Sequence, residues 1–166
     1  VAIRVGSCGA LQPGMGLGDL VVATAAARCD GTTALYADPA FPAVPDWDVT
    51  AALADAASKT GARLHVGPVH SHDSFYVDDY QEIRERWRRL GLVASDMETG
   101  ALFVIGRIRG LKTGSILNVV VTAEGHTDEG IARFQRGEEM TRRGERNSIL
   151  AALEALRVTA GGPQQV

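Results

Sequence analysis

The sequence predicts an α/β domain in which a mostly parallel central sheet is flanked by helices. Short apolar segments typical of buried strands alternate along the chain with amphipathic segments typical of helices. The stretch 115–122 is apolar on both faces, as a central parallel strand is. Glycines and prolines separate these segments and mark the turns.

Length and composition favour a single globular domain. The 166 residues are 45% hydrophobic and 22% charged, and we expect one domain over 1–160 with a disordered tail at 161–166. The net charge of −3 argues against a nucleic-acid partner, and no apolar run is long enough to span a membrane. Two cysteines make no disulfide framework, which favours a reducing, cytoplasmic location.

The first strand, 2–5, runs into two glycines three residues apart, Gly6 and Gly9. A glycine turn at a strand end leaves backbone N–H groups free to bind an anion. Arg4 and Ser7 beside it would add a guanidinium and a hydroxyl group. The pattern predicts an anion site, although ordinary α/β turns are built in the same way.

The middle of the chain continues the alternation. A loop rich in Gly and Pro leads to a strand at 20–24. Asp46 predicts the N-cap of a helix that runs to Lys59, with Gly61 as its stop signal. A strand over 62–69 follows.

Helical and strand patterns alternate again in the second half of the chain. The pattern predicts a helix from Tyr80 to Leu90, a short strand at 92–95 and a helix after Thr99. The positively charged run 84–89 is interpreted as the outer face of its helix. The last helix is expected to bury one apolar face, formed by Ile149, Leu153 and Leu156.

Polar segments follow three of the predicted strands: Ser7, 70–76 and 122–128. Because the carboxyl ends of parallel strands share one edge of a sheet, we expect these segments to converge.

Several side chains could bind a ligand there. Glu98, at the start of a helix, suits either the helix dipole or the hydroxyl groups of a diol, and Met97 could form an apolar floor or fill the core. Phe75 and Tyr76 could stack on a flat ligand or cover the domain surface. His70 and His72 lack further ligands at a recognisable metal-binding spacing, so no metal is predicted.

Taken together, these motifs resemble the hexameric uridine and purine nucleoside phosphorylases. The matching segments are Arg4–Ala10, Gly18–Asp19, Phe41–Val44, His65–Gly67, Asp73–Tyr76 and Asp96–Glu98. The first segment looks purine-type, whereas the stretch from Phe41 to Tyr76 looks uridine-type. The resemblance implies a nucleoside phosphorylase fold.

The resemblance also implies reversible phosphorolysis of a nucleoside to a free base and ribose 1-phosphate. Inorganic phosphate would be the co-substrate, with no other cofactor, in a dimer-based homo-oligomer such as a hexamer. Arg4 and Ser7 would bind phosphate, Met97 and Glu98 the ribose, and Phe75 the base and sugar. The matched motifs also contain Cys8, Gly9, Tyr76 and Asp96, and the resemblance implies that these residues bind substrate as well.

Three departures from the family pattern leave alternatives open. The family has a further portion of chain before Arg4 that completes the phosphate site, so we expect the domain to be N-terminally incomplete. Asp79 and Gln81 stand near the positions at which uridine-type enzymes recognise uracil through a glutamine and an arginine, so the family pair is not matched. After the long central strand, Glu124 is the nearest acid that could assist base departure, with Asp128 second. A nucleosidase and a non-catalytic nucleoside-binding fragment are the alternative functions.

Overall fold

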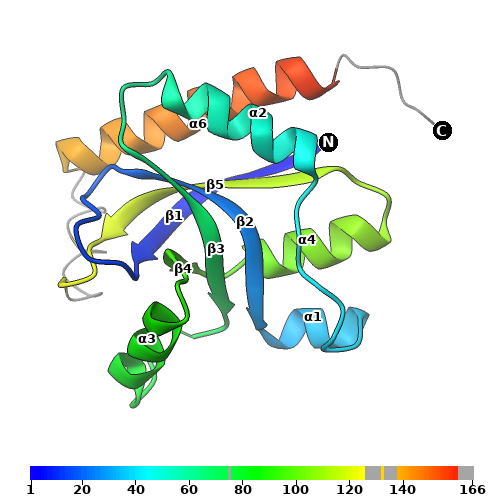
Figure 1. Ribbon diagram of the computed structural model, residues 1–166, viewed down its shortest axis with the longest axis vertical. Coiled ribbons are helices and arrows are strands. Elements are labelled where there is room, and N and C mark those ends of the chain that lie inside the picture. Colours follow the sequence, from blue (N-terminus) through cyan, green and yellow to red (C-terminus); the bar gives the residue numbers. More distant parts are fainter. Residues whose placement is uncertain (75, 126–131, 133–137, 161–166) are drawn as a thin grey trace.

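The computed structural model describes residues 1–74, 76–125, 132 and 138–160. Its five strands form a closed barrel in the order β1-β4-β3-β2-β5. The strands are β1 (Ala2–Ala10), β2 (Leu20–Cys29), β3 (Leu64–His72), β4 (Ala94–Asp96) and β5 (Thr113–Val121). Helices α2 (Trp47–Ser58) and α6 (Glu139–Ala160) cover one side of this barrel, and α4 (Thr99–Ile108) covers another (Figure 1).

The sheet is mixed, so the prediction of a mostly parallel sheet is correct only as far as an α/β fold. Three pairs of strands are parallel, namely β1 with β5, β2 with β3, and β3 with β4. Two pairs are antiparallel, namely β1 with β4 and β2 with β5. The strands therefore form two groups of opposite direction, β1 with β5 and β2 with β3 and β4.

The loop between the first two strands explains this reversal. A parallel connection needs a crossover, usually a helix, but a loop can return the chain in the opposite direction. The segment 11–19 contains no helix, and β2 runs antiparallel to β5. The polar ends of β1 and β5 therefore share one edge. Strand β3 runs in the opposite direction, but its polar end lies near that of β1, because Ser95 of β4 pairs with both Gly9 and His70.

Strand β1 is longer than predicted and contains no glycine turn. It pairs with β5 from Ala2 to Gly9, with an irregularity in register between Cys8 and Gly9. Neither Gly6 nor Gly9 has a positive φ angle. Pairing along most of β5 holds this glycine-rich segment extended, so the predicted anion-binding turn is wrong.

The ends of the helices at 47–58 and 80–89 follow the sequence signals closely. Asp46 caps α2 by accepting hydrogen bonds from the backbone N–H groups of Asp48 and Val49, as predicted. Gly61 and Gly91 end their helices with φ angles of 77° and 83°. Helix α3 comprises Tyr80–Arg89, and a short helix that the sequence did not predict, α1, comprises Gly31–Tyr36.

Helix α6 buries a different face from the one predicted. Ile149 and Leu153 are 44% and 58% exposed. Small residues face the core instead, because they allow the helix to approach α2 and β5 closely; the buried residues of α6 are Thr141, Gly144, Ser148, Ala151, Ala152 and Ala155. A Cβ atom at Gly144 would lie 2.7 Å from the backbone of Gly18, which shows how close this approach is.

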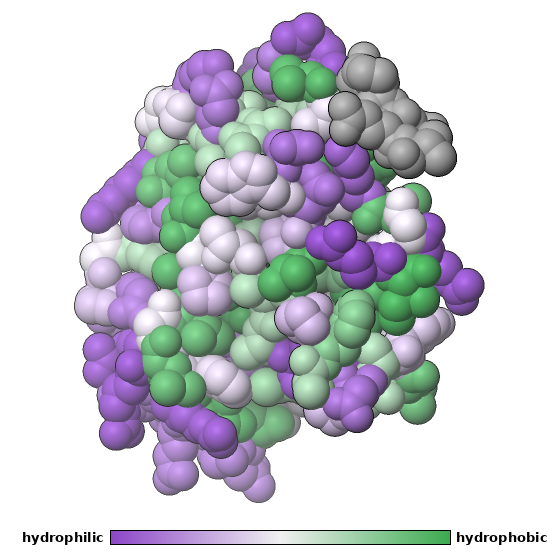
Figure 2. Space-filling view, turned by 45° about the vertical axis from the view of Figure 1, so that its right-hand side comes forward, coloured by the Kyte–Doolittle hydropathy of each residue, from purple (hydrophilic) through white to green (hydrophobic). Residues whose placement is uncertain are grey.

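Apolar packing lies on both sides of the barrel wall. One cluster joins α2 and α6 to β2 and β5, and another joins Phe103 and Val104 of α4 to β1, β3 and β5. The face in Figure 2 intersperses hydrophobic and polar side chains. None of the described helices combines the length and apolarity needed to cross a membrane.

Candidate functional site

Arg4 on β1 joins two carboxylates that precede α4. Its Nε donates to Asp96 Oδ2 at 2.9 Å, and one terminal nitrogen lies 2.6 Å from Glu98 Oε2. The side chain of Asp96 is fully buried, whereas that of Glu98 is 61% exposed. One guanidinium thus faces two carboxylates, of which only Glu98 is open to solvent.

Asp96 is held firmly by the start of α4. Its Oδ2 also accepts hydrogen bonds from the Thr99 backbone N–H at 3.0 Å and from the Thr99 hydroxyl at 2.5 Å. The Thr99 hydroxyl in turn lies 2.9 Å from that of Ser115 on β5. Asp96 therefore fixes Arg4 against the barrel and satisfies the first turn of the helix. The sequence alone pointed to neither Thr99 nor Ser115.

Gly6 provides the space that Arg4 occupies. A Cβ atom at Gly6 would lie 2.7 Å from the Arg4 Cζ atom. Residues two apart on a strand share a face, so the guanidinium lies over the missing side chain of Gly6. The glycine pattern that suggested a turn in fact makes room for an arginine.

Cys8 lies on the same face of β1 and is buried, with 4% of its surface exposed. Burial raises the pKa of its thiol far above the usual range, and the negative charge of Asp96 raises it further. The thiol is therefore protonated at neutral pH and cannot act as a thiolate nucleophile.

The other predicted residues of β1 lie differently. Ser7 is exposed, and three residues from Arg4 on a continuous strand it leaves from the opposite face. Gly9 pairs with Ser95 of β4, next to Asp96. The structure thus groups Arg4 and Cys8 with Asp96 and does not bring Ser7 into that group.

The residues predicted to contact the sugar and base are less enclosed. Met97, between the two carboxylates, is partly buried. Tyr76 is 79% exposed, and Phe75 lies outside the described residues, as does Asp128.

His70 and His72 on β3 form an aromatic stack instead of a metal site. The His70 ring lies 4.9 Å from Trp87 of α3 and 4.7 Å from His72, measured between ring centroids. Burial lowers the pKa of His70 to about 4, and the neighbouring His72 contributes to the shift. Among the described residues, no group of three or more His, Cys, Asp or Glu side chains could hold a metal ion.

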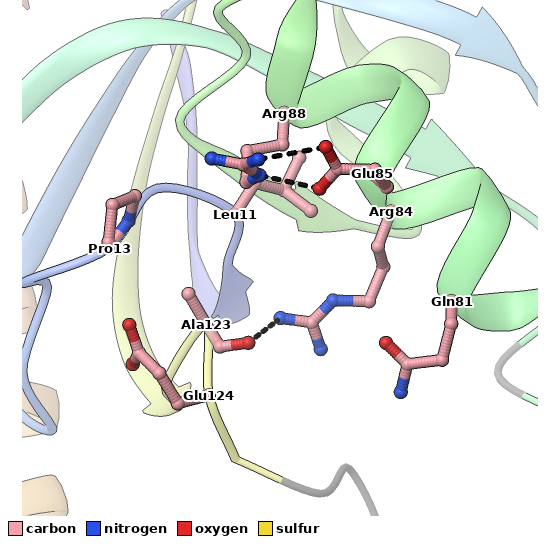
Figure 3. Close-up of a pocket in the computed structure, with 8 residues that line it drawn as sticks. All are labelled: Leu11, Pro13, Gln81, Arg84, Glu85, Arg88, Ala123 and Glu124. Atoms are coloured by element: carbon pink, nitrogen blue, oxygen red, sulfur yellow. Dashed lines mark hydrogen bonds and ion pairs between the residues drawn. The ribbon is translucent and has the colours of Figure 1, made fainter.

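A second group surrounds a hollow of about 410 Å³ beyond the end of β1 (Figure 3). It lies between α3, the chain after β1 and the chain after β5, and its lining residues are Leu11, Pro13, Gln81, Arg84, Glu85, Arg88, Ala123 and Glu124. Glu124, the predicted acid, is exposed at this hollow.

Arg84 corrects the interpretation of 84–89 as a wholly outward face. It is 8% exposed, and one terminal nitrogen donates to the backbone oxygen atoms of Ala10 at 2.9 Å and Ala123 at 3.1 Å. The charge pattern of α3 gave no indication of this burial. Arg88 and Arg89, farther along the helix, do face solvent beside Glu85.

These contacts place a guanidinium and a solvent-exposed carboxylate side by side at the barrel of an α/β protein. Arg4 supplies the cation, and the exposed Glu98 can accept hydrogen bonds from hydroxyl groups. The chain belongs to the phosphorylase superfamily, which matches residues 1–157. The family predicted from the sequence motifs is thereby confirmed.

Named relatives agree with this family. The chain is 42% identical over 117 residues to the guanosine phosphorylase of Halorubrum lacusprofundi, covering 70% of the chain and 48% of the relative. It is 36% identical over 166 residues to the uridine phosphorylase of Treponema pallidum, covering 94% and 62%. The crystal structure of Vibrio fischeri uridine phosphorylase superimposes with a TM-score of 0.85 at 36% identity, covering 95% of this chain and 63% of that one. The chain thus spans about half to two thirds of the length of these proteins.

Proposed function

We propose that this chain catalyses phosphorolysis of the N-glycosidic bond of uridine or a purine nucleoside. The products are the free base and ribose 1-phosphate. The proposal rests on one observation: the Arg4 guanidinium contacts both a buried carboxylate, Asp96, and an exposed one, Glu98. The former can hold the cation in place while the latter exchanges its partner.

Phosphate binds by replacing Glu98 at Arg4. Asp96 stays bonded to Nε and keeps the guanidinium oriented, so that its terminal nitrogens face the incoming anion. Asp96 acts through Arg4, because its own side chain is fully buried. The exposed pair between Arg4 and Glu98 costs little to break, since such pairs contribute at most about 1 kcal/mol.

The displaced Glu98 accepts hydrogen bonds from the ribose hydroxyl groups, with Met97 beside the sugar. Breakage of the C1′–N bond gives the sugar oxocarbenium character, and a phosphate held next to C1′ stabilises that positive charge. The phosphate oxygen then forms the new bond to C1′, while the bonding electrons leave with the base. Holding phosphate and sugar together supplies a further, entropic part of the rate increase.

Most of the remaining predicted contacts belong to the same proposal. Gly9 would contact phosphate from β1, Tyr76 and Phe75 the nucleoside, and Glu124 the departing base. Ser7 leaves β1 from the face opposite Arg4 and is not part of this proposal. Cys8 would support Arg4 by packing, since its thiol is buried and protonated.

We further propose that the chain works as a homo-oligomer in the cytoplasm. The support is the resemblance of the sequence motifs to the hexameric uridine and purine nucleoside phosphorylases. Static light scattering after size exclusion would reveal a monomer if this part of the proposal is wrong.

The direct test is base release from uridine, inosine, guanosine and adenosine with and without inorganic phosphate. Release that requires phosphate, with ribose 1-phosphate identified by ³¹P NMR, is the expected result. Release without phosphate would instead identify a nucleosidase. Binding of a nucleoside without release would identify a non-catalytic binding protein.

A further inference from the structure

Three strong donors converge on a single oxygen of Asp96, the buried carboxylate that holds Arg4. The Oδ2 atom accepts from Arg4 Nε at 2.9 Å, from the Thr99 backbone N–H at 3.0 Å and from the Thr99 hydroxyl at 2.5 Å. The other oxygen, Oδ1, is buried, and no donor within the described part of the chain reaches it. The orientation in which Asp96 faces Arg4 is therefore set at Oδ2, where two of the three donors belong to Thr99.

The hydroxyl groups of Thr99 and Ser115 form a short relay behind this carboxylate. An ionised carboxylate only accepts hydrogen bonds, so the Thr99 hydroxyl donates its single proton to Asp96. In the 2.9 Å contact between the two hydroxyls, Ser115 is then the donor and the Thr99 oxygen is the acceptor. Both residues are fully buried, so water does not compete for these bonds. Each bond in such a chain polarises the next one, which strengthens the hold on Asp96.

The barrel brings the relay to Arg4 from the neighbouring strand. Ser115 of β5 is the register partner of Arg4 on β1. Residues paired in register project from the same face of a sheet. Thr99, at the start of α4, bonds to both Ser115 and Asp96 and so joins β5 to the end of β4. Four elements, β1, β4, α4 and β5, thus determine where the guanidinium of Arg4 lies.

Helix α1 carries the same capping pattern without these additions. Asp30 accepts from the backbone N–H of Thr33 at 2.7 Å and from its hydroxyl at 3.1 Å. The two donors bind different oxygens there, and no ion pair joins Asp30 to a cation among the described residues. Helix capping alone accounts for Asp30 and Thr33. It does not account for the arginine at Asp96 or for the second hydroxyl at Thr99.

We propose that Thr99 and Ser115 are positioning residues for the binding of phosphate. Through Asp96 they fix the plane of the Arg4 guanidinium, so that its terminal nitrogens are oriented before the anion arrives. A cation that is already oriented loses less freedom on binding and therefore binds more tightly. Neither hydroxyl touches the phosphate in this proposal.

This inference rests on the proposed function and deepens it by separating the two substrates. The relay acts on the phosphate side of the site. The Glu98 carboxylate, which would bind the ribose, makes no capping bond to α4 and is 61% exposed. Loss of the relay should therefore weaken phosphate binding and leave nucleoside binding unchanged.

Isothermal titration with inorganic phosphate, uridine and inosine would compare the unaltered chain with Thr99→Val and Thr99→Ser. Valine keeps the shape of threonine but removes the hydroxyl, whereas serine retains the hydroxyl. We expect the phosphate affinity to fall about tenfold in Thr99→Val and to stay close to the unaltered value in Thr99→Ser. The affinity for uridine or inosine, whichever the unaltered chain binds, should not change. A merely structural role of Thr99 would not produce this difference between the two substrates.

Thr33→Val is the matched control, because it removes the same kind of buried hydroxyl bond at α1. Its phosphate affinity should equal that of the unaltered chain. Ser115→Ala covers the case in which Thr99→Val does not fold, since it removes the outer hydroxyl and keeps both Thr99 donors. It should lower phosphate affinity about threefold while the near-ultraviolet circular dichroism stays native.

Four results would overturn the inference. They are full phosphate affinity in the folded Thr99→Val or Ser115→Ala variant, an equal loss in Thr33→Val, no recovery in Thr99→Ser, and no phosphate binding by the unaltered chain.

Turnover separates this inference from the proposed function. In an active chain, Thr99→Val should raise the Michaelis constant for phosphate about tenfold and leave that for the nucleoside unchanged. Phosphate affinity that depends on Thr99 in a chain that releases no base would reject the proposed function and leave the positioning role standing. Phosphate-dependent release with the same Michaelis constant for phosphate in every variant would reject the positioning role alone.

Discussion

Arg4 and Arg84 lie against the same strand, β1, but the fold neutralises their charges differently. Arg4 faces two carboxylates, Asp96 and Glu98. Arg84 is deeper, 8% exposed, and the oxygens bonded to it belong to backbone carbonyls and to the Tyr80 hydroxyl. The Arg4 group therefore carries a net negative charge and the Arg84 group a net positive one.

This difference concerns what each arginine would have to release in order to bind a ligand. In the proposed function, phosphate takes the place of Glu98 at Arg4, which releases that carboxylate for a sugar. Arg84, in contrast, is bonded only to neutral oxygens among the described residues. Four substitutions test parts of this comparison, and we take them from the largest expected effect to the smallest.

Removal of the Arg4 charge should have the largest effect. Arg4→Met leaves Asp96 as a buried carboxylate without its cation, which should lower the free energy of unfolding by about 3–5 kcal/mol. Urea unfolding measures the loss. In the double variant with Asp96→Asn the unpaired charge is gone. This variant should regain most of the free energy of unfolding but should show no phosphate-dependent activity. A single variant as stable as the unaltered chain would contradict the role of this pair.

Glu98→Gln should separate activity from stability. The side chain is 61% exposed and makes no capping hydrogen bond to α4, so the free energy of unfolding should change by at most about 1 kcal/mol. Turnover should fall by about 10²-fold, because the amide cannot replace the carboxylate at the ribose. Phosphate should bind more tightly, since its competitor is gone. Glu145→Gln, on the exposed face of α6, is the control, and equal turnover in both variants would refute the assignment.

Gly6→Ala should displace Arg4 without unfolding the barrel. The new Cβ atom would lie 2.7 Å from the flexible guanidinium, which can move away from Asp96. We expect the Michaelis constant for phosphate to rise about tenfold. Gly16→Ala is the matched control, because Gly16 lies in the loop after β1 and the nearest atom to its Cβ would be Asp19 Oδ1 at an ordinary 3.7 Å. The same rise in both variants would count against a specific fit between Gly6 and Arg4.

The smallest effect concerns the docking of α3, which carries Arg84. His70 stacks on Trp87 of that helix and has its pKa lowered to about 4 from about 6.5 in an unfolded chain. The unfolded state therefore binds the proton more readily, so this contribution is present above pH 6.5 and is lost as the pH falls towards 4. We expect a loss of about 2 kcal/mol over that range. His70→Phe keeps an aromatic ring on Trp87 and should remove this part of the pH dependence of the free energy of unfolding, measured with urea. An unchanged pH dependence would contradict this contribution of His70.

Local signals predicted the elements better than their arrangement. Asp46 and Gly61 marked the ends of α2 because capping depends on a few adjacent residues. The direction of β2 and the buried face of α6 depend on packing between distant segments. For α6 the apolar spacing favoured Ile149 and Leu153, but alanines and Gly144 allow the closer approach.

The candidate site shows the same limit. The motif Asp96-Met97-Glu98 identified both carboxylates, but the sequence did not reveal that one is buried and the other exposed. Arg84 stands among alternating charges on α3, and nothing in that pattern distinguishes it from its solvent-facing neighbours. Its burial follows from the ends of β1 and β5, which are far from it in the sequence.

The most direct test of the central claim is the affinity of inorganic phosphate for the unaltered chain, Arg4→Lys and Arg84→Lys, measured by isothermal titration. Lysine keeps the charge but cannot hold both an anion and Asp96 in the fork geometry of arginine. We predict that phosphate affinity falls at least tenfold in Arg4→Lys and stays unchanged in Arg84→Lys. A loss confined to Arg84→Lys, or no loss in either variant, would contradict the assignment of phosphate to Arg4.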